Sequence, residues 1–118
     1  MISIIDDDYS VREAVKSLIR SIGYDAVTFA SAEEYLGSES VHDFQCVITD
    51  LQMPGMTGID LQERLIADGY RKPIILMSAL SKKDIDSPAT KTAAFDFLRK
   101  PFSDERLIKC LDKALGRR

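Results

Sequence analysis

The fold is decided by residues 46–60, which read CVITDLQMPGMTGID. The stretch opens with a short, almost wholly apolar run at 46–49, which is typical of a parallel strand buried on both faces. The MPG sequence at 53–55 signals a turn, and Thr57 followed by Asp60 matches the capping box that starts a helix. These residues therefore predict a strand, a tight loop and a helix, with Asp50 at the carboxyl end of the strand.

The same alternation recurs along the rest of the chain. Apolar strand-like runs occupy residues 2–5, 26–29, 46–49, 74–77 and 95–98. Stripes at helical spacing lie between them and after the last of them. Helix starts are predicted at Ser10, Ser31, Thr57 and Ser103, and helix ends at Gly23, Gly37, Gly69 and Gly116. The order β-α-β-α-β-α-β-α-β-α predicts one doubly wound α/β domain over residues 1–118.

The fourth predicted helix breaks the pattern. It should occupy residues 82–92, but Pro88 lies inside that range. A proline in a helix interior costs about 3 kcal/mol, whereas at the first helical position its missing N–H is harmless. We therefore expect Ser87 to cap a short, late-starting helix that is the most labile element of the fold.

The length and composition of the chain exclude several classes of function. A chain of 118 residues makes a single domain. Its 16 Lys and Arg against 19 Asp and Glu give a net charge of -3, which disfavours direct nucleic-acid binding. The sequence has no membrane-length apolar run and no signal peptide, so we expect a cytoplasmic protein. Cys46 and Cys110 are expected to be reduced core thiols, and His42, the one histidine, a surface residue.

Reactive polar residues follow four of the five predicted strands. The first strand is followed by Asp6, Asp7 and Asp8, the third ends with Asp50, the fourth ends with Ser78, and Lys100 lies just beyond the fifth. Ligands of such sheets bind outside the carboxyl ends of the strands, where parallel strands bring these residues to one edge. Each residue alone has an ordinary explanation, as a turn former, a helix cap, a satisfied hydroxyl or a surface charge. Their convergence favours a common site.

The chemistry of this edge follows from its charges. Two carboxylates about 4 Å apart repel by about 4 kcal/mol at an effective dielectric of about 20, so Asp6, Asp7 and Asp50 need a cation besides Lys100. Oxygen ligands without histidine or cysteine favour Mg²⁺ or Mn²⁺. Such a metal and Lys100 would bind phosphoryl oxygens, with Ser78 donating to a third, and would make Asp50 a nucleophile that forms an acyl phosphate.

The sequence resembles the receiver domain of bacterial two-component response regulators along its whole length. The residues that carry the resemblance are IDDD at 5–8, TDLQMPGMTG at 49–58, LMSA at 76–79 and FLRKPF at 97–102. The segments at 31–36 and 95–98 are similar to receivers that precede LuxR-type helix-turn-helix output domains. The resemblance implies a flavodoxin-like five-stranded parallel sheet of order 2-1-3-4-5.

The resemblance also implies a set of metal ligands. Asp50 would accept a phosphoryl group from a sensor histidine kinase or a histidine phosphotransfer protein. Asp7 and Asp50 would bind Mg²⁺ directly, Asp6 largely through water, and Gln52 through its backbone carbonyl.

A second group of residues would convert phosphorylation into a change of shape. Lys100 would pair with the phosphoryl group, Ser78 would swing toward it, and the small Ala79 would leave it room. Phe97 stands at the position of the rotating switch aromatic, with a fixed core ring as the ordinary alternative. The family implies a cis Lys100–Pro101 bond.

The resemblance further implies a surface for partners. The face built from the fourth helix, fifth strand and fifth helix usually forms a homodimer or docks an output partner. Lys91, Asp96 and Arg99 are its candidate contacts here. The atypical fourth helix and Ala93, which replaces a usual glycine, affect this face more than the chemistry.

Two other functions stay open at this stage. An aspartate-nucleophile phosphatase is one, but its motif expects an aspartate where Gln52 stands, and it needs a cap domain. A receiver-like interaction module not controlled by phosphorylation is the other. The leading prediction is a phosphorylation-controlled switch rather than an enzyme. We expect no output domain within the chain, which is either a stand-alone receiver or a fragment.

Overall fold

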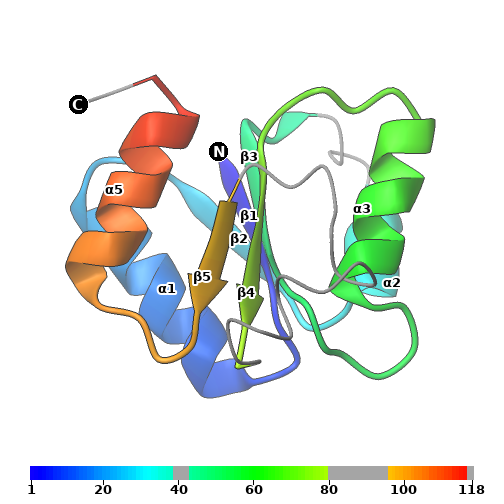
Figure 1. Ribbon diagram of the computed structural model, residues 1–118, viewed down its shortest axis with the longest axis horizontal. Helices are drawn as coiled ribbons and strands as arrows, with labels where there is room; N and C mark the ends of the chain where they lie inside the picture. The colour runs from blue at the N-terminus through cyan, green and yellow to red at the C-terminus, as the bar shows by residue number, and fades with distance from the viewer. Residues whose placement is uncertain (39–42, 80–95, 117–118) are drawn as a thin grey trace.

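Five parallel strands form one twisted sheet at the centre of the molecule (Figure 1). The computed structural model describes residues 1–38, 43–79 and 96–116. The elements are β1 (Ile2–Ile5), α1 (Tyr9–Ser21), β2 (Ala26–Phe29), α2 (Ala32–Leu36), β3 (Cys46–Asp50), α3 (Gly58–Ala67), β4 (Ile74–Ser78), β5 (Asp96–Arg99) and α5 (Asp104–Ala114). The strand order β2-β1-β3-β4-β5, parallel throughout, confirms the predicted doubly wound, flavodoxin-like sheet.

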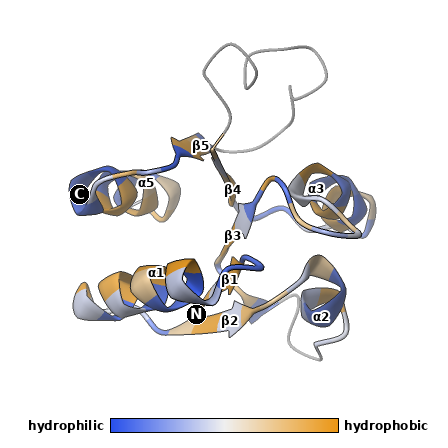
Figure 2. Ribbon diagram, turned by 90° about the horizontal axis from the view of Figure 1, so that it is seen from below, coloured by the Kyte–Doolittle hydropathy of each residue, from blue (hydrophilic) through white to orange (hydrophobic). Residues whose placement is uncertain are grey.

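Helices cover both faces of this sheet. Figure 2 shows α1 and α5 on one side and α2 and α3 on the other. Successive side chains of a strand point to opposite faces, so Val47 and Leu76 pack in the cluster under α2 and α3, whereas Ile48 and Ile75 pack under α1 and α5. Because both faces are buried, the strands must be apolar along almost their whole length.

Three of the four predicted helix caps are confirmed. Ser31, Thr57 and Ser103 each accept a hydrogen bond from the backbone N–H three residues later. The predicted cap at Ser10 is wrong, because Asp8 caps α1 by accepting from the N–H groups of Ser10 and Val11. A carboxylate satisfies two orphan amides and also complements the positive end of the helix dipole, so the helix starts earlier than expected.

The strand ends differ slightly from the predicted ones. β3 and β4 each extend one residue further, so that Asp50 pairs with Met77 and Ser78 pairs with Arg99 in the ladder. β5 is described from Asp96 rather than Phe95, which lies outside the described residues. The reactive residues Asp50 and Ser78 are therefore held by strand hydrogen bonding rather than by loops.

Other expectations have mixed outcomes. Cys46 and Cys110 are free and buried, as predicted. Gly37 ends α2, as predicted, although its φ of -77° is right-handed and does not require a glycine. Among the described helices, none is both long and apolar enough to span a bilayer. The predicted fourth helix, with Ser87, Pro88, Lys91 and Ala93, and the predicted surface residue His42 lie outside the described residues.

Candidate functional site

Three carboxylates meet at the carboxyl edge of the sheet. β1 pairs with β3 in the register Ile5↔Thr49, so Asp6, which follows β1, lies beside Asp50, the last residue of β3. Asp6, Asp7 and Asp50 each offer a carboxylate oxygen, and these three oxygens lie within 4.8 Å of one another. Asp6 is fully buried, Asp50 is 7% exposed, and Asp7 is exposed. The cluster is therefore open to solvent on the side of Asp7.

Lys100 bridges two of these carboxylates. Its Nζ lies 2.8 Å from Asp6 Oδ2 and 3.3 Å from Asp50 Oδ1. The Lys100 backbone N–H donates to the carbonyl oxygen of Ser78 at 2.7 Å, which extends the β4–β5 ladder and fixes the base of the side chain. The sequence prediction that an acidic group and an amine meet at this edge is confirmed.

The electrostatics show a shortage of positive charge. Burial, and after it the charge of Asp6, raises the pKa of Asp50 above its ordinary value, although Lys100 acts in the opposite direction. Burial alone would lower the pKa of Lys100, but its hydrogen bond to Asp6 and the charges of Asp50 and Asp6 raise the pKa overall. Lys100 is therefore a firmly protonated ammonium between carboxylates that it does not fully neutralise.

A divalent cation fits this site. Three carboxylates against one ammonium leave two formal negative charges, which equals the charge of a divalent ion. All the donors are oxygens, which is the set that Mg²⁺ and Mn²⁺ prefer, and the exposed side leaves room for water or substrate as further ligands. The residues present therefore suit the predicted magnesium ion.

The remaining predicted site residues lie around this cluster. Ser78, fully buried, ends β4, which is the neighbour of β3 in the sheet. Ala79 follows it and is exposed. Gln52 is exposed in the loop between β3 and α3, two residues beyond Asp50. Its place is compatible with a carbonyl ligand, and this role, like that of Ser78, stays a prediction.

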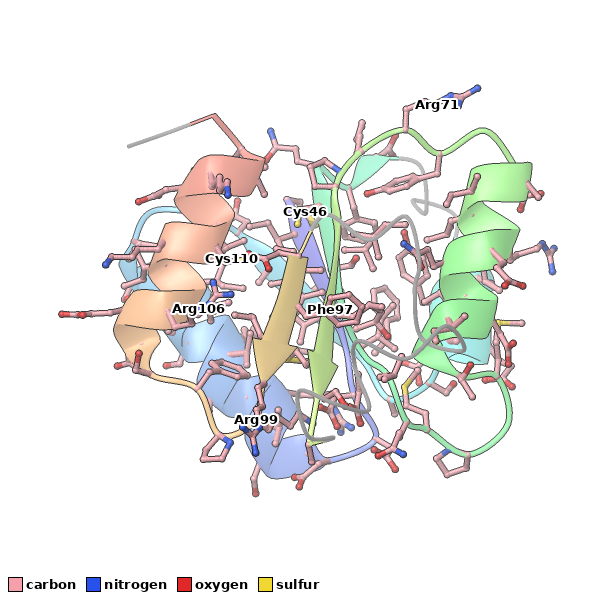
Figure 3. The ribbon with its side chains drawn as sticks, viewed as in Figure 1. Cys46, Arg71, Phe97, Arg99, Arg106 and Cys110 are labelled. Carbon is pink, nitrogen blue, oxygen red and sulfur yellow. The ribbon has the colours of Figure 1, made fainter. Side chains whose placement is uncertain are left out.

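Phe97 lies within β5 (Figure 3). Its ring is partly buried and packs against the core under α2 and α3. Arg99 ends β5 and is exposed, which leaves it accessible to a partner. The Lys100–Pro101 bond is cis, as predicted. Rotation of Phe97 stays a prediction, because a single arrangement of the ring is described.

Asp96 is engaged within the molecule. It accepts from the Phe97 N–H at 2.8 Å, from the Arg106 guanidinium at 3.4 Å and from the Cys110 thiol at 3.4 Å. Arg106 also donates to the Phe97 carbonyl at 3.2 Å (Figure 3). Asp96 thus ties the start of β5 to α5.

The Asp96 interactions predict a pH-dependent stability. Burial acts to raise the Asp96 pKa, but the hydrogen bonds from Phe97, Arg106 and Cys110 outweigh it and lower the pKa below 3.8. A depressed carboxyl pKa stabilises the fold above the unfolded value, and this contribution is lost as pH falls through the folded value. We expect Asp96→Asn to lower the free energy of unfolding by about 1 kcal/mol at neutral pH, measured by urea unfolding.

The difference between Asp96→Asn and wild type should shrink as the pH falls below 3.8. Asp25→Asn is the control, because its exposed carboxylate makes no hydrogen bond to the described residues. That variant should stay within about 0.5 kcal/mol of wild type. An Asp96 effect that is constant across this pH range would contradict the ionic origin.

Three residues that support the site were not singled out from the sequence. Arg12 Nη1 donates to the Asp6 carbonyl at 2.7 Å. Glu33 Oε2 accepts from the Met56 N–H at 3.1 Å and so holds the loop that contains Gln52. Gly58 lies so close to β3 that a Cβ there would overlap the Asp50 carbonyl oxygen. Of these three residues, only Arg12 could have been noticed in the sequence. It is a basic residue in the first turn of a helix, where the helix dipole disfavours a positive charge.

An apolar groove of about 470 Å³ opens beside the site, between α1 and the segment that links β5 to α5. Val11, Leu18, Phe102 and Lys100 are among the residues that line it. Lys100 therefore belongs both to the acidic cluster, through its ammonium, and to the lining of this groove. The cluster is bordered on this side by a mostly apolar surface, to which Asp104 also contributes.

The fold and the site define a doubly wound α/β domain with an acidic edge whose oxygen ligands suit a divalent cation. The model of the response regulator receiver domain matches residues 2–112. The chain belongs to this family.

Known relatives agree with this assignment. The chain is 39% identical over 115 residues to the response regulator protein TodT of Pseudomonas putida, covering 98% of this chain and 51% of TodT. It is 35% identical over 114 residues to the transcriptional regulatory protein FixJ of Bradyrhizobium diazoefficiens, covering 97% of this chain and 56% of FixJ. The chain thus spans about half the length of these curated relatives.

A solved structure is similar over almost the whole chain. The response regulator protein TrrA of Thermotoga maritima, crystallised in complex with Mg(2+)-BeF, superposes with a TM-score of 0.86 at 28% identity. The match covers 97% of each chain.

Proposed function

We propose that this chain is the receiver of a two-component phosphorelay and that Asp50 is its phosphoacceptor. The observation that supports this most directly is the cluster of Asp6, Asp7 and Asp50 around the Lys100 ammonium. An Asp50 oxygen would attack the phosphorus of a phosphohistidine from a sensor kinase or a phosphotransfer protein. The O–P bond would form as the P–N bond breaks, and the departing imidazole nitrogen would take a proton from water. The product is an acyl phosphate on Asp50.

Each residue of the cluster has a separate task in this reaction. Asp7 and Asp50, with the Gln52 carbonyl and water held by Asp6, would bind Mg²⁺. When bound, the ion supplies positive charge to the phosphoryl oxygens, and Mn²⁺ accepts the same ligands. Lys100 keeps its proton, as its raised pKa requires, and pairs with another phosphoryl oxygen. The contacts to Asp6 and Asp50 hold its ammonium in place for this.

Phosphorylation would act on the shape of the domain through local charge. A phosphoryl dianion on Asp50 attracts the Ser78 hydroxyl at the end of β4 and strengthens the pairing with Lys100. Movement of Ser78 makes room for Phe97 to turn inward and so changes the surface of β5 and α5. The phosphoryl group biases an existing equilibrium between two arrangements of this surface. That surface would form a homodimer or bind an output partner.

We propose a phosphoacceptor rather than an enzyme that turns over external substrates, acting in the cytoplasm without binding nucleic acid itself. TodT is named a response regulator and FixJ a transcriptional regulatory protein, so regulation of transcription is the output we propose for a protein that contains this domain.

Intact-mass measurement tests the proposal. Incubation with Mg²⁺ and acetyl phosphate should raise the mass of the protein by one phosphoryl group, with acetate as the leaving group. Chelation of the metal should prevent the gain, because the charge of Asp6, Asp7 and Asp50 would then repel the phosphodonor.

Asp50→Asn is the matched control for this measurement. It keeps the shape of the side chain and removes the nucleophilic carboxylate, so the mass gain should disappear. Turnover of assorted phosphoesters would instead favour the phosphatase. A wild-type mass that never changes, even with a purified histidine kinase, would favour the interaction module.

A further inference from the structure

Arg12 reaches back over the loop that contains the acidic residues. It is the fourth residue of α1, and helical side chains lean toward the N-terminus of their helix. Its Nη1 donates to the Asp6 carbonyl at 2.7 Å, and its Cζ lies 5.5 Å from the centroid of the Tyr9 ring. Within the described part of the chain it forms no ion pair with a carboxylate. Its contacts are therefore to the main chain of the loop and to a ring.

Asp7 depends on the main chain for its orientation. Its carboxylate is exposed, and neither its side chain nor its N–H has a hydrogen-bond partner among the described residues. The Asp7 N–H and the Asp6 carbonyl belong to the same planar peptide group. When Arg12 fixes that carbonyl, it also fixes the plane from which the Asp7 side chain projects.

Asp6 does not depend on Arg12 in this way. Its N–H donates to the Phe29 carbonyl at 3.2 Å. Its carboxylate accepts from the Asp8 N–H at 2.9 Å and from Lys100 Nζ at 2.8 Å. Arg12 therefore mainly orients Asp7, which of the three carboxylates has the fewest hydrogen bonds to hold it among the described residues.

Because Arg12 is a cation, an electrostatic effect and a positioning role predict opposite results when it is removed. A cation in the first turn of a helix is unfavourable with respect to the helix dipole. A cation near a metal site also repels the metal ion. Charge alone thus predicts that removal of Arg12 strengthens metal binding, whereas a role in positioning Asp7 predicts that removal weakens it.

We propose that Arg12 is a positioning residue for the metal site, which holds the peptide between Asp6 and Asp7 so that the Asp7 carboxylate faces Mg²⁺. This inference rests on the proposed function, because it names the residue that prepares a ligand of the same site. Arg12 itself contacts neither the metal nor the phosphoryl group in this proposal.

Calorimetric titration with Mg²⁺ alone tests the proposal. Arg12→Met removes the charge and the donors but keeps a long apolar stem, and it should weaken Mg²⁺ binding about ten-fold, as loss of a partner of metal ligands does. Arg20→Met removes the same charge from an exposed position two turns further along α1, and should leave the affinity near that of wild type. Unchanged or tighter binding by Arg12→Met would overturn the proposal.

A second readout separates this proposal from the proposed function. In metal-free protein, the amide resonance of Asp7 should shift in Arg12→Met but stay in place in Arg20→Met. If wild-type protein binds no Mg²⁺, the proposed function fails, and the Asp7 resonance still decides whether Arg12 orders the loop. If Arg12→Met does not fold, Arg12→Lys serves instead. It keeps the charge but loses the planar fork, so Mg²⁺ binding as tight as wild type would count against positioning.

Discussion

Replacing Lys100 by methionine should lower the free energy of unfolding of the metal-free domain by about 3 kcal/mol. The variant keeps the apolar stem but removes the cation that lies 2.8 Å from Asp6 and 3.3 Å from Asp50. Asp6 is fully buried, so its carboxylate would remain without a counter-ion and close to a second carboxylate. Removal of one partner of a buried pair costs more than the pair itself contributes. Urea unfolding followed by circular dichroism measures the loss.

Magnesium should restore much of this stability. A ligand that binds only the folded state stabilises it in proportion to the logarithm of its concentration over its dissociation constant. Without the lysine ammonium the carboxylates attract the ion more strongly, so Mg²⁺ should stabilise Lys100→Met more than wild type. Adding Asp50→Asn should also recover part of the loss, because it removes one of the two repelling charges.

Lys109→Met is the matched control for Lys100→Met. Lys109 is exposed on α5 and forms no ion pair within the described residues. Its loss should change the free energy of unfolding by less than about 0.5 kcal/mol, with or without Mg²⁺. If both variants lose the same small amount, the carboxylates at the sheet edge do not depend on Lys100.

The sequence was sufficient to predict the acidic site at the carboxyl edge of the sheet, because the strand topology determines which residues meet there. Parallel strands must be apolar when helices cover both faces, and their carboxyl ends must meet, so Asp6, Asp50 and Lys100 had to converge. The same reasoning failed at Ser10, where a serine hydroxyl and the Asp8 carboxylate compete for the same helix amides. Asp6 and Asp7 were predicted to lie at the site and do so, whereas the role of Asp8 as the cap of α1 is seen only in the structure.

Contacts between loops and neighbouring helices could not be predicted in this way. Glu33 reaches Met56 across 23 residues, and that contact depends on how α2 lies against the loop after β3. Arg12 donates to the Asp6 carbonyl through one particular side-chain rotamer, and the hydrophobic periodicity of the sequence does not specify that rotamer. In the sequence, Gly58 appeared only as the last residue of the stretch 49–58 that carries the resemblance. Its importance comes from the distance between two backbones, which the sequence does not contain.

Replacing Gly58 by alanine should destabilise the domain by about 2 to 3 kcal/mol and slow phosphorylation of Asp50. A Cβ at this position would overlap the Asp50 carbonyl oxygen and lie 3.0 Å from the Leu51 Cα. Both neighbours are backbone atoms at the end of a central strand, so they cannot turn aside as a flexible side chain would. The Gly58 N–H also donates to the Leu51 carbonyl at 3.0 Å, which holds α3 against this strand end. The added methyl must push α3 away or displace Asp50 from Lys100.

Gly37→Ala separates this steric effect from the general consequences of replacing glycine. A Cβ at Gly37 would meet only the carbonyl oxygens of Glu33 and Glu34, at ordinary distances of 3.5 and 3.6 Å. Because its φ of -77° suits alanine, Gly37→Ala should be neutral or more stable than wild type by about 0.4–1 kcal/mol. Urea unfolding and the rate of mass gain with acetyl phosphate measure both variants. Similar stabilities and rates for the two would show that α3 and β3 tolerate a methyl group between them, and that Gly58 does not constrain the phosphoacceptor.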